Sequence, residues 1–78
     1  MSMFLCTACE RSMMLETRNA ESAAKVAATI TAKRRHGSDG RTFTVRELAS
    51  DNRGKRYEAE IGTEEIRETV LVTVEQFE

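Results

Sequence analysis

Apolar and polar residues alternate along the second half of the chain, in the pattern of half-buried β-strands. Residues 41–48 and 55–61 both show it, and the turn-forming residues of the stretch 49–54 between them predict a hairpin connection. The side chains expected to face the core from these two strands are Phe43, Val45, Tyr57, Ala59 and Ile61.

The register of this hairpin follows from folding it about residue 52. A slip of one residue would turn every apolar side chain to the solvent face, so a register that keeps the apolar pairs together is favoured. An opposite-charge pair on the other face would add about 0.2–1 kcal/mol. The expected pairs are Phe43 with Ile61, Val45 with Ala59, Glu47 with Tyr57, Arg46 with Glu58, and Thr44 with Glu60.

The most strand-like stretch is 68–77, where Val70, Val72 and Val74 are expected to face the core. Residues 62–67 before it are interpreted as a turn or a single helical turn. The opposite sheet face is left open, and its apolar members indicate a partner, a dimer or a cover made by the N-terminal residues. The side chains expected there are Thr42, Thr44, Arg46, Leu48, Glu58, Glu60, Leu71, Thr73 and Phe77.

One full-length helix is predicted between Thr17 and Gly37. Asn19 is a good N-cap and Glu21 adds negative charge to the first turn, where the helix dipole favours it. Basic residues 33–35 and a glycine end the helix. Apolar residues recur at helical spacing and predict a narrow buried face of small side chains: Ala20, Ala23, Val26, Ala27 and Ile30.

The N-terminal segment leaves two alternatives open. Residues 13–17 are expected to form a strand entering the helix, with Met13 and Leu15 inward. Residues 3–9 form either a separate strand or the first part of one long bent strand, with a break at 10–12. The sequence therefore predicts a single α+β domain over residues 1–78: one alanine-rich helix on an antiparallel sheet of about four strands, arranged as a strand, the helix and a three-stranded meander.

Composition places the chain among globular proteins, since 40% of the 78 residues are hydrophobic and 32% are charged. Seventy-eight residues can bury only a modest core. The chain shows no apolar run of membrane-spanning length and no basic start typical of a signal peptide, so no membrane association is expected and a cytoplasmic location is the default.

The net charge of −1 hides a separation along the chain. Residues 33–56 hold eight basic and three acidic side chains, whereas residues 57–78 hold one basic and seven acidic. These segments can pair across the sheet, or one of them can form a contact patch for a charged partner.

Cys6 and Cys9 form a Cys-x-x-Cys element, which can supply half of a zinc site. A structural zinc needs four ligands, and the only histidine is His36, so a site would require a carboxylate or a second chain. A redox pair would need a strand-to-helix context that the neighbouring residues do not offer. Core packing of both cysteines and a solvated loop position for His36 are therefore expected, with no metal and no cofactor.

No catalytic site is predicted, because the chain has no phosphate loop, nucleophile elbow or histidine-containing metal motif. Two basic clusters offer contacts to phosphate or to an acidic protein surface, although only Tyr57 lies near for base stacking. A small nucleic-acid-binding protein that uses the basic segment 33–56 therefore remains an alternative to a protein-binding one, and so does a zinc-stabilised interaction module. The predicted partner-binding residues are Arg34, Arg35, Arg53, Lys55 and Arg56.

Residues 15–27 (Leu-Glu-Thr-Arg-Asn-Ala-Glu-Ser-Ala-Ala-Lys-Val-Ala) and 40–48 (Gly-Arg-Thr-Phe-Thr-Val-Arg-Glu-Leu), followed by a hairpin, resemble small phage-encoded anti-CRISPR proteins. The resemblance covers about residues 13–61 and concerns layout: a strand, an alanine-rich helix and a meander. It implies a non-catalytic inhibitor in the host cytoplasm, monomeric or dimeric. Such an inhibitor would bind a host ribonucleoprotein surveillance complex and block its capture of target DNA. The Cys-x-x-Cys start has no counterpart in that group.

Overall fold

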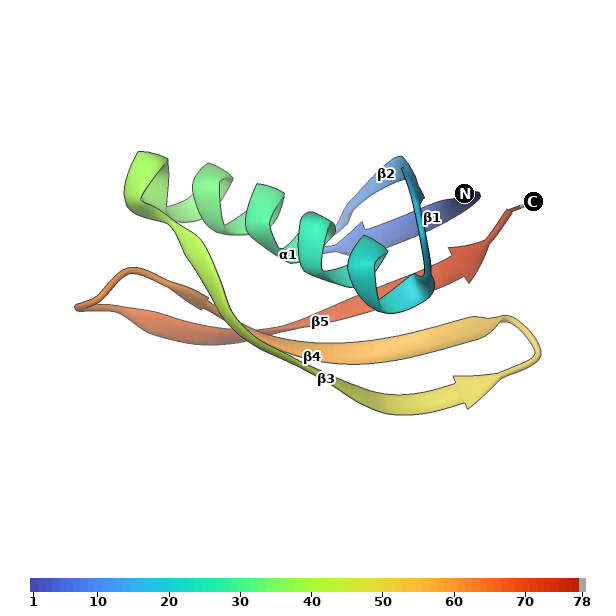
Figure 1. The fold of residues 1–78 in the computed structure, drawn as a ribbon. Helices are drawn as coiled ribbons and strands as arrows, with labels where there is room; N and C mark the ends of the chain where they lie inside the picture. The colour runs from blue at the N-terminus through green and yellow to red at the C-terminus, as the bar shows by residue number, and fades with distance from the viewer. Residues whose placement is uncertain (78) are drawn as a thin grey trace.

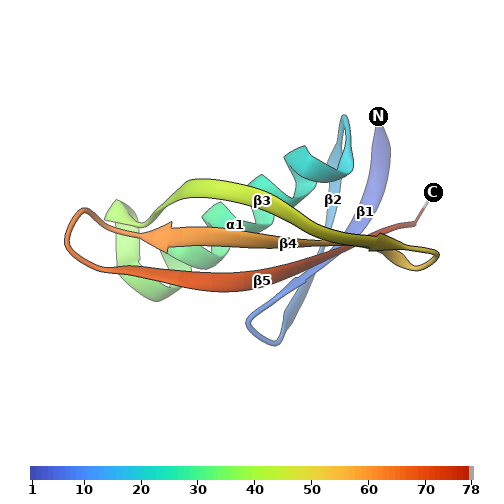
Figure 2. The same cartoon turned by 90° about the horizontal axis from the view of Figure 1, so that it is seen from below.

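The computed structural model describes residues 1–77. Figure 1 shows one helix, α1, lying across one face of a sheet, and Figure 2 shows the sheet from its other side. The sheet has five antiparallel strands in the order β2-β1-β5-β4-β3, which confirms the α+β prediction with five strands rather than about four. The elements are β1 (Ser2–Ala8), β2 (Arg11–Thr17), α1 (Ala20–His36), a 3₁₀ turn (Gly37–Asp39), β3 (Arg41–Asp51), β4 (Gly54–Gly62) and β5 (Arg67–Gln76).

The N-terminal residues form a hairpin of two separate strands, which settles the alternative that the sequence left open. Its turn is Cys9–Glu10 rather than the expected break at 10–12, and both residues have positive φ (51° and 64°), as type I′ turns require. β1 then pairs with β5, with Thr7 opposite Thr73. The hairpin therefore widens the sheet and does not cover its open face.

The helix begins and ends where its capping residues predict. The Asn19 side-chain oxygen accepts a hydrogen bond from the Ser22 backbone N–H at 2.8 Å. Four basic residues occupy the last turn, and Gly37 follows with φ 82°. Figure 1 shows that α1 connects the two edges of the sheet, since β2 precedes it and β3 follows it.

The predicted buried face of the helix is partly wrong. Val26 is 40% exposed and Ile30 is only partly buried, because the helix is rotated so that smaller side chains meet the sheet. Thr31 is buried there because its hydroxyl donates to the Ala27 carbonyl at 2.8 Å. The buried helix residues are Ala23, Ala24, Ala27, Ala28, Thr31 and Ala32.

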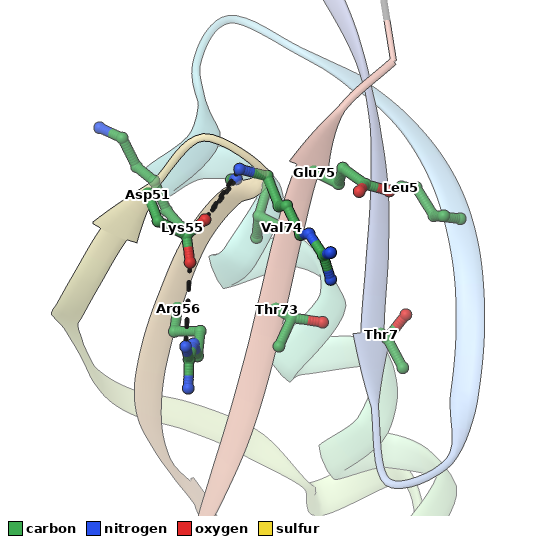
Figure 3. A pocket seen from close by; sticks show the side chains of 10 residues that line it. Leu5, Thr7, Asp51, Lys55, Arg56, Thr73, Val74 and Glu75 are labelled. Carbon is green, nitrogen blue, oxygen red and sulfur yellow. Dashed lines mark hydrogen bonds and ion pairs between the residues drawn. The ribbon is translucent and has the colours of Figure 1, made fainter.

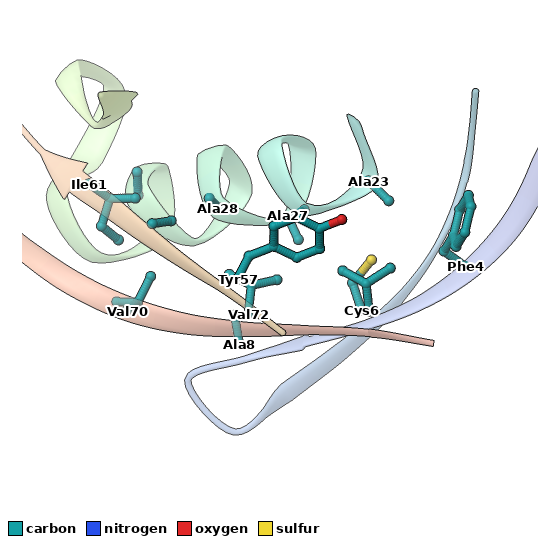
Figure 4. Close-up of a cluster of buried hydrophobic side chains, with 14 residues drawn as sticks. Phe4, Cys6, Ala8, Ala23, Ala27, Ala28, Tyr57, Ile61, Val70 and Val72 are labelled. Atoms are coloured by element: carbon teal, nitrogen blue, oxygen red, sulfur yellow. The ribbon is translucent and has the colours of Figure 1, made fainter. Parts of the chain in front are cut away.

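The sheet supplies the large side chains of the core, as the alternation predicts. Figure 4 shows the Tyr57 ring between the sheet and α1, beside Ala27. Met13 and Leu15 pack against the core from β2, as expected. The buried sheet residues are Phe4, Cys6, Ala8, Tyr57, Ala59, Ile61, Val70, Val72 and Val74.

The register predicted for β3 and β4 is confirmed from Thr44 to Glu47, and it is wrong at Phe43. An irregularity between Thr42 and Thr44 places Thr42 opposite Ile61 in its stead. Thr42 thereby turns toward the helix rather than the open face, and its hydroxyl lies 2.8 Å from that of Thr29. Phe43 lies instead against two guanidinium groups, 3.8 Å from that of Arg67 and 4.9 Å from that of Arg41.

Two connections also differ from the prediction. A second irregularity, at Leu48, lets β3 and β4 continue to Asp51 and Gly54, so most of the stretch 49–54 is strand and only residues 52–53 turn. Residues 62–67 contain no helical turn: β4 ends at Gly62, and the Thr63 N–H donates to the Ile66 carbonyl at 2.7 Å. The strands of the β3–β4 hairpin are therefore longer than predicted, and both connections are shorter than predicted.

Candidate functional site

Ion pairs between the basic and the acidic segment neutralise part of the charge that the sequence separates. Three basic residues of the segment 33–56 reach acidic residues of the segment 57–78, as one of the two interpretations predicts. Each exposed pair of this kind is worth about 0–1 kcal/mol, so the pairs neutralise the surface more than they stabilise it. The pairs between the segments are Arg35–Glu68, Arg41–Glu64 and Arg46–Glu58, at 2.8, 3.4 and 2.8 Å.

The five predicted partner-binding residues do not come together. Arg34 and Arg35 lie at the C-terminal end of α1, whereas the other three belong to the tip of the β3–β4 hairpin. That tip adjoins the other end of the helix, since Ala20 and Arg53 line a common hollow. Figure 1 shows the two ends of α1 far apart along the sheet. The two basic clusters that the sequence indicates therefore remain two separate patches in the fold.

The cluster at the C-terminal end of α1 is an internal salt bridge. The Arg35 guanidinium donates to both Glu68 oxygens, at 2.8 and 3.0 Å. His36 Nε2 lies 2.6 Å from Glu68 Oε2, and its side chain is 14% exposed, so the expectation of a solvated loop histidine is wrong. This geometry holds the helix end onto the start of β5. Within residues 1–77, Arg34 forms no ion pair, and Lys33 donates only to the backbone carbonyls of Ser38 and Gly40.

The hydrogen bonds from Arg35 hold the pKa of Glu68 below its ordinary value; burial opposes this shift and His36 adds to it. A carboxyl group with a depressed folded-state pKa stabilises the fold above its unfolded-state pKa, near 4.5, and loses that contribution as the pH falls through the folded-state value. We therefore expect Glu68→Gln to lower the free energy of unfolding at neutral pH, with the difference from wild type shrinking below pH 4.5.

Urea unfolding at a series of pH values measures this difference. Glu65→Gln is the matched control, because Glu65 is exposed and forms no ion pair within the described chain. A loss in Glu68→Gln that is the same at acidic and neutral pH would contradict the assignment of the effect to this carboxylate.

The cysteines occupy different environments. Cys6 is fully buried under α1, as expected, and burial raises the pKa of its thiol to about 11. Cys9 is exposed in the β1–β2 turn, so the expectation that it packs in the core is wrong. Zinc binds the thiolate form, which burial disfavours at Cys6. Among residues 1–77 no three His, Cys, Asp or Glu side chains gather closely enough to hold a metal ion.

The second basic cluster borders a hollow of about 260 Å³ on the open face of the sheet. Figure 3 shows Arg56, Thr73 and Thr7 side by side on three neighbouring strands, with Leu5 and Glu75 at the rim. The lining residues are Leu5, Thr7, Asp51, Arg53, Gly54, Lys55, Arg56, Thr73, Val74 and Glu75. The sequence indicates its arginines through charge clustering but gives no signal for Thr7 or Leu5, because their place depends on the pairing of β1 with β5.

Asp51 organises the basic side of this hollow. Its Oδ1 accepts from the backbone N–H groups of Arg53 and Gly54, at 2.8 and 3.1 Å, which fixes the turn. Its Oδ2 lies 3.9 Å from the Arg56 guanidinium. Lys55 is on the other side of the sheet, 3.8 Å from Glu47. Two of the three predicted residues at this tip, Arg53 and Arg56, are therefore directed to one place.

Apolar side chains are also exposed on the open face. Leu71 is 51% exposed and alternates with the buried valines of β5, and Met14 is 46% exposed between the inward residues of β2. Phe77 is 62% exposed just beyond β5. Leu71 and Phe77 were expected on this face, whereas Met14 was not singled out. No side chain within residues 1–77 covers them, because the N-terminal hairpin extends the sheet.

The part of the chain that the structure describes has no helix long and apolar enough to cross a membrane. Comparisons of the chain with protein-family models, with curated proteins and with solved structures gave no match.

Proposed function

We propose that this chain is a non-catalytic binding protein that docks onto a partner protein or ribonucleoprotein through the open face of its sheet. The observation that carries the proposal is the exposure of Leu71 and Met14 on that face, next to the hollow at Arg56. Large apolar side chains among polar and charged ones are typical of protein docking surfaces.

The charges of this face favour a protein partner over a phosphate backbone. Arg46 is paired with Glu58, and Arg67 lies 3.7 Å from Glu60, so cations and carboxylates are interleaved along the same strands. A nucleic acid needs an uninterrupted row of free cations to displace its counterions. A protein surface can match an interleaved pattern charge by charge.

The resemblance to anti-CRISPR proteins gives the proposal a specific form. The partner is then a surveillance complex in the host cytoplasm, and the chain prevents that complex from binding its target DNA. This role needs surface complementarity and no chemistry, and an open sheet face with mixed charge and exposed leucine and methionine side chains suits it.

Affinity capture from bacterial lysate, with and without nuclease and read by mass spectrometry, tests the proposal. Leu71→Lys places a charge on the open face, and Val26→Lys is the matched control on the outer side of α1, since Val26 is also apolar and exposed. We expect a defined complex that survives nuclease, is lost with Leu71→Lys and is kept with Val26→Lys. A gel-shift assay of target-DNA binding by a captured surveillance complex then tests the inhibitor form.

Two outcomes would contradict the proposal. Equal capture by all three proteins would remove the open face as the contact surface. Recovery of mixed nucleic-acid-associated proteins that are lost after nuclease treatment would indicate that the chain binds nucleic acid directly.

A further inference from the structure

The hollow on the open face joins two arginines to a row of hydroxyl groups. Arg56, Thr73 and Thr7 are register partners on three adjacent strands. Ser12 continues the row on β2, with its hydroxyl 2.9 Å from that of Thr7, and Arg53 lines the hollow from the turn. Guanidinium and hydroxyl groups donate hydrogen bonds to anionic oxygens, so this row suits a negatively charged group.

Both arginines are available to an incoming anion. Arg53 forms no ion pair through its side chain with any of residues 1–77. The Arg56 guanidinium lies 3.9 Å from Asp51 Oδ2, and both side chains are more than half exposed. An exposed pair of this kind contributes about 0–1 kcal/mol to the free energy of unfolding. Binding an anion therefore breaks no strong internal contact. The turn that carries Arg53 is held by Asp51 through backbone hydrogen bonds that do not involve either guanidinium.

The surroundings of the hollow favour a single carboxylate over a chain of phosphates. Glu75 and Asp51 line it together with the arginines. A nucleic-acid strand carries a charge about every 3.4 Å, so phosphates next to a bound one would meet these carboxylates. An extended protein segment directs alternate side chains to the sheet and can place one carboxylate there without a second beside it.

Apolar groups flank the arginine and hydroxyl row along the strands. Leu5 lines the hollow, and Leu71 lies two residues from Thr73 on the same face of β5. Met14 pairs with Leu5 across β1 and β2 and is itself exposed. An extended segment with one carboxylate and with apolar residues two positions to either side directs all three side chains to the sheet, and can therefore contact both kinds of group at once.

We infer that this hollow binds a carboxylate side chain of an extended, acidic protein segment that has apolar residues two positions to either side of that carboxylate. The inference rests on the proposed function, because it names the part of the partner that the open face recognises. Arg53 and Arg56 bind the carboxylate, Thr73 and Thr7 donate to it from their hydroxyl groups, and Leu5 and Leu71 contact its apolar neighbours.

A labelled short peptide with a single aspartate, and with a leucine two positions to either side of it, serves as the probe, titrated against the full chain. We expect NMR amide shifts at Thr7, Thr73 and Arg56, and about 10-fold weaker binding, by fluorescence anisotropy, to the double variant R53E/R56E, since two exposed charge pairs contribute about 1.4 kcal/mol together. Arg34→Glu is the control for bulk charge, and a peptide with asparagine in place of aspartate is the control for shape. The Arg34→Glu protein should bind the aspartate peptide like wild type. The asparagine peptide should bind the wild-type chain as weakly as the aspartate peptide binds the double variant.

Each contrary outcome overturns the inference. The first is that no NMR amide shifts occur at the residues of the hollow, and the second is that Arg34→Glu and the double variant lose equal affinity for the peptide. The third is that a short oligothymidylate binds the same residues more tightly than the peptide does. The capture experiment with Leu71→Lys separates this inference from the proposed function. Nuclease-resistant capture that depends on Leu71, together with no binding of the peptide, would keep the docking face and reject its acidic ligand.

Discussion

Tyr57→Ala is expected to lower the free energy of unfolding by about 3–5 kcal/mol, the range for removing a buried aromatic side chain. Tyr57 is 2% exposed and heads the fully buried side chains of the core by volume. The helix above it offers only short side chains, with Ala23 and Ala27 nearby (Figure 4). Alanines cannot extend to fill the space, so the cavity stays. Domains of this size are stable by about 4–12 kcal/mol, so the variant loses a large share of its stability.

Tyr57→Phe separates the ring from the hydroxyl group. Burial, and then the charges of Glu47 and Glu21, raise the pKa of the Tyr57 hydroxyl, so this group lies near the polar margin of the core. Because this hydroxyl forms no hydrogen bond within residues 1–77, its removal is expected to cost less than the about 1.5 kcal/mol that one hydrogen bond contributes at most. Urea unfolding followed by circular dichroism measures both variants. A cost of Tyr57→Ala within about 1 kcal/mol of that of Tyr57→Phe would show that the core collapses around the missing ring.

Local patterns were sufficient for the helix limits and for most of the core. Asn19 and Gly37 mark the ends of α1 because capping depends on backbone groups within one turn. The valines of β5 and the core residues of β4 are found by alternation, because the side-chain period of a strand is fixed. These features require no knowledge of which strand pairs with which.

The predictions of buried residues are wrong where a single residue shifts the order of inward-facing and outward-facing side chains. The irregularity at Phe43 moves an aromatic residue out of the core and brings Thr42 in, and no local signal distinguishes the two registers. In the helix, Val26 fits the apolar spacing as well as Ala24 does. The choice between them is made by the close approach of α1 to the sheet, which only small side chains permit.

The sequence left the N-terminal hairpin as only one of two alternatives, for a chemical reason. Two-residue type I′ turns favour Asn-Gly because both positions need positive φ, and here Cys9 and Glu10 occupy them. The same ambiguity hides the binding hollow, because Thr7 and Leu5 reach it only through the pairing of β1 with β5. The charged half of the candidate site is therefore visible in the sequence, and its hydroxyl and apolar half is a product of long-range strand pairing.

Gly62→Ala is the second change with a large expected effect. Gly62 ends β4 with φ 143°, a conformation that costs other residues about 1–3 kcal/mol. A Cβ atom there would also lie far inside van der Waals contact with the Ile66 carbonyl oxygen. That oxygen cannot retreat freely, because it accepts the 2.7 Å hydrogen bond from the Thr63 N–H that closes the β4–β5 turn. The backbone strain and the overlap of the Cβ atom together are expected to lower the free energy of unfolding by more than the about 1–3 kcal/mol of the strain alone.

Gly37→Ala is the matched control, because Gly37 also has positive φ but has nothing within 4 Å of the position of a Cβ atom. Its φ of 82° and ψ of −165° lie in a region that essentially only glycine adopts, so its cost is expected to be that of the backbone strain alone, about 1–3 kcal/mol. Urea unfolding measures the stability of both variants, and their midpoint concentrations can be compared directly when the dependence of the free energy on urea has the same slope. A Gly62→Ala protein as stable as Gly37→Ala would mean that the turn relaxes at no cost.

Because the β4–β5 turn lies at the far end of the sheet from the hollow, a Gly62→Ala protein that remains folded should still bind the acidic peptide, which distinguishes lost stability from lost recognition.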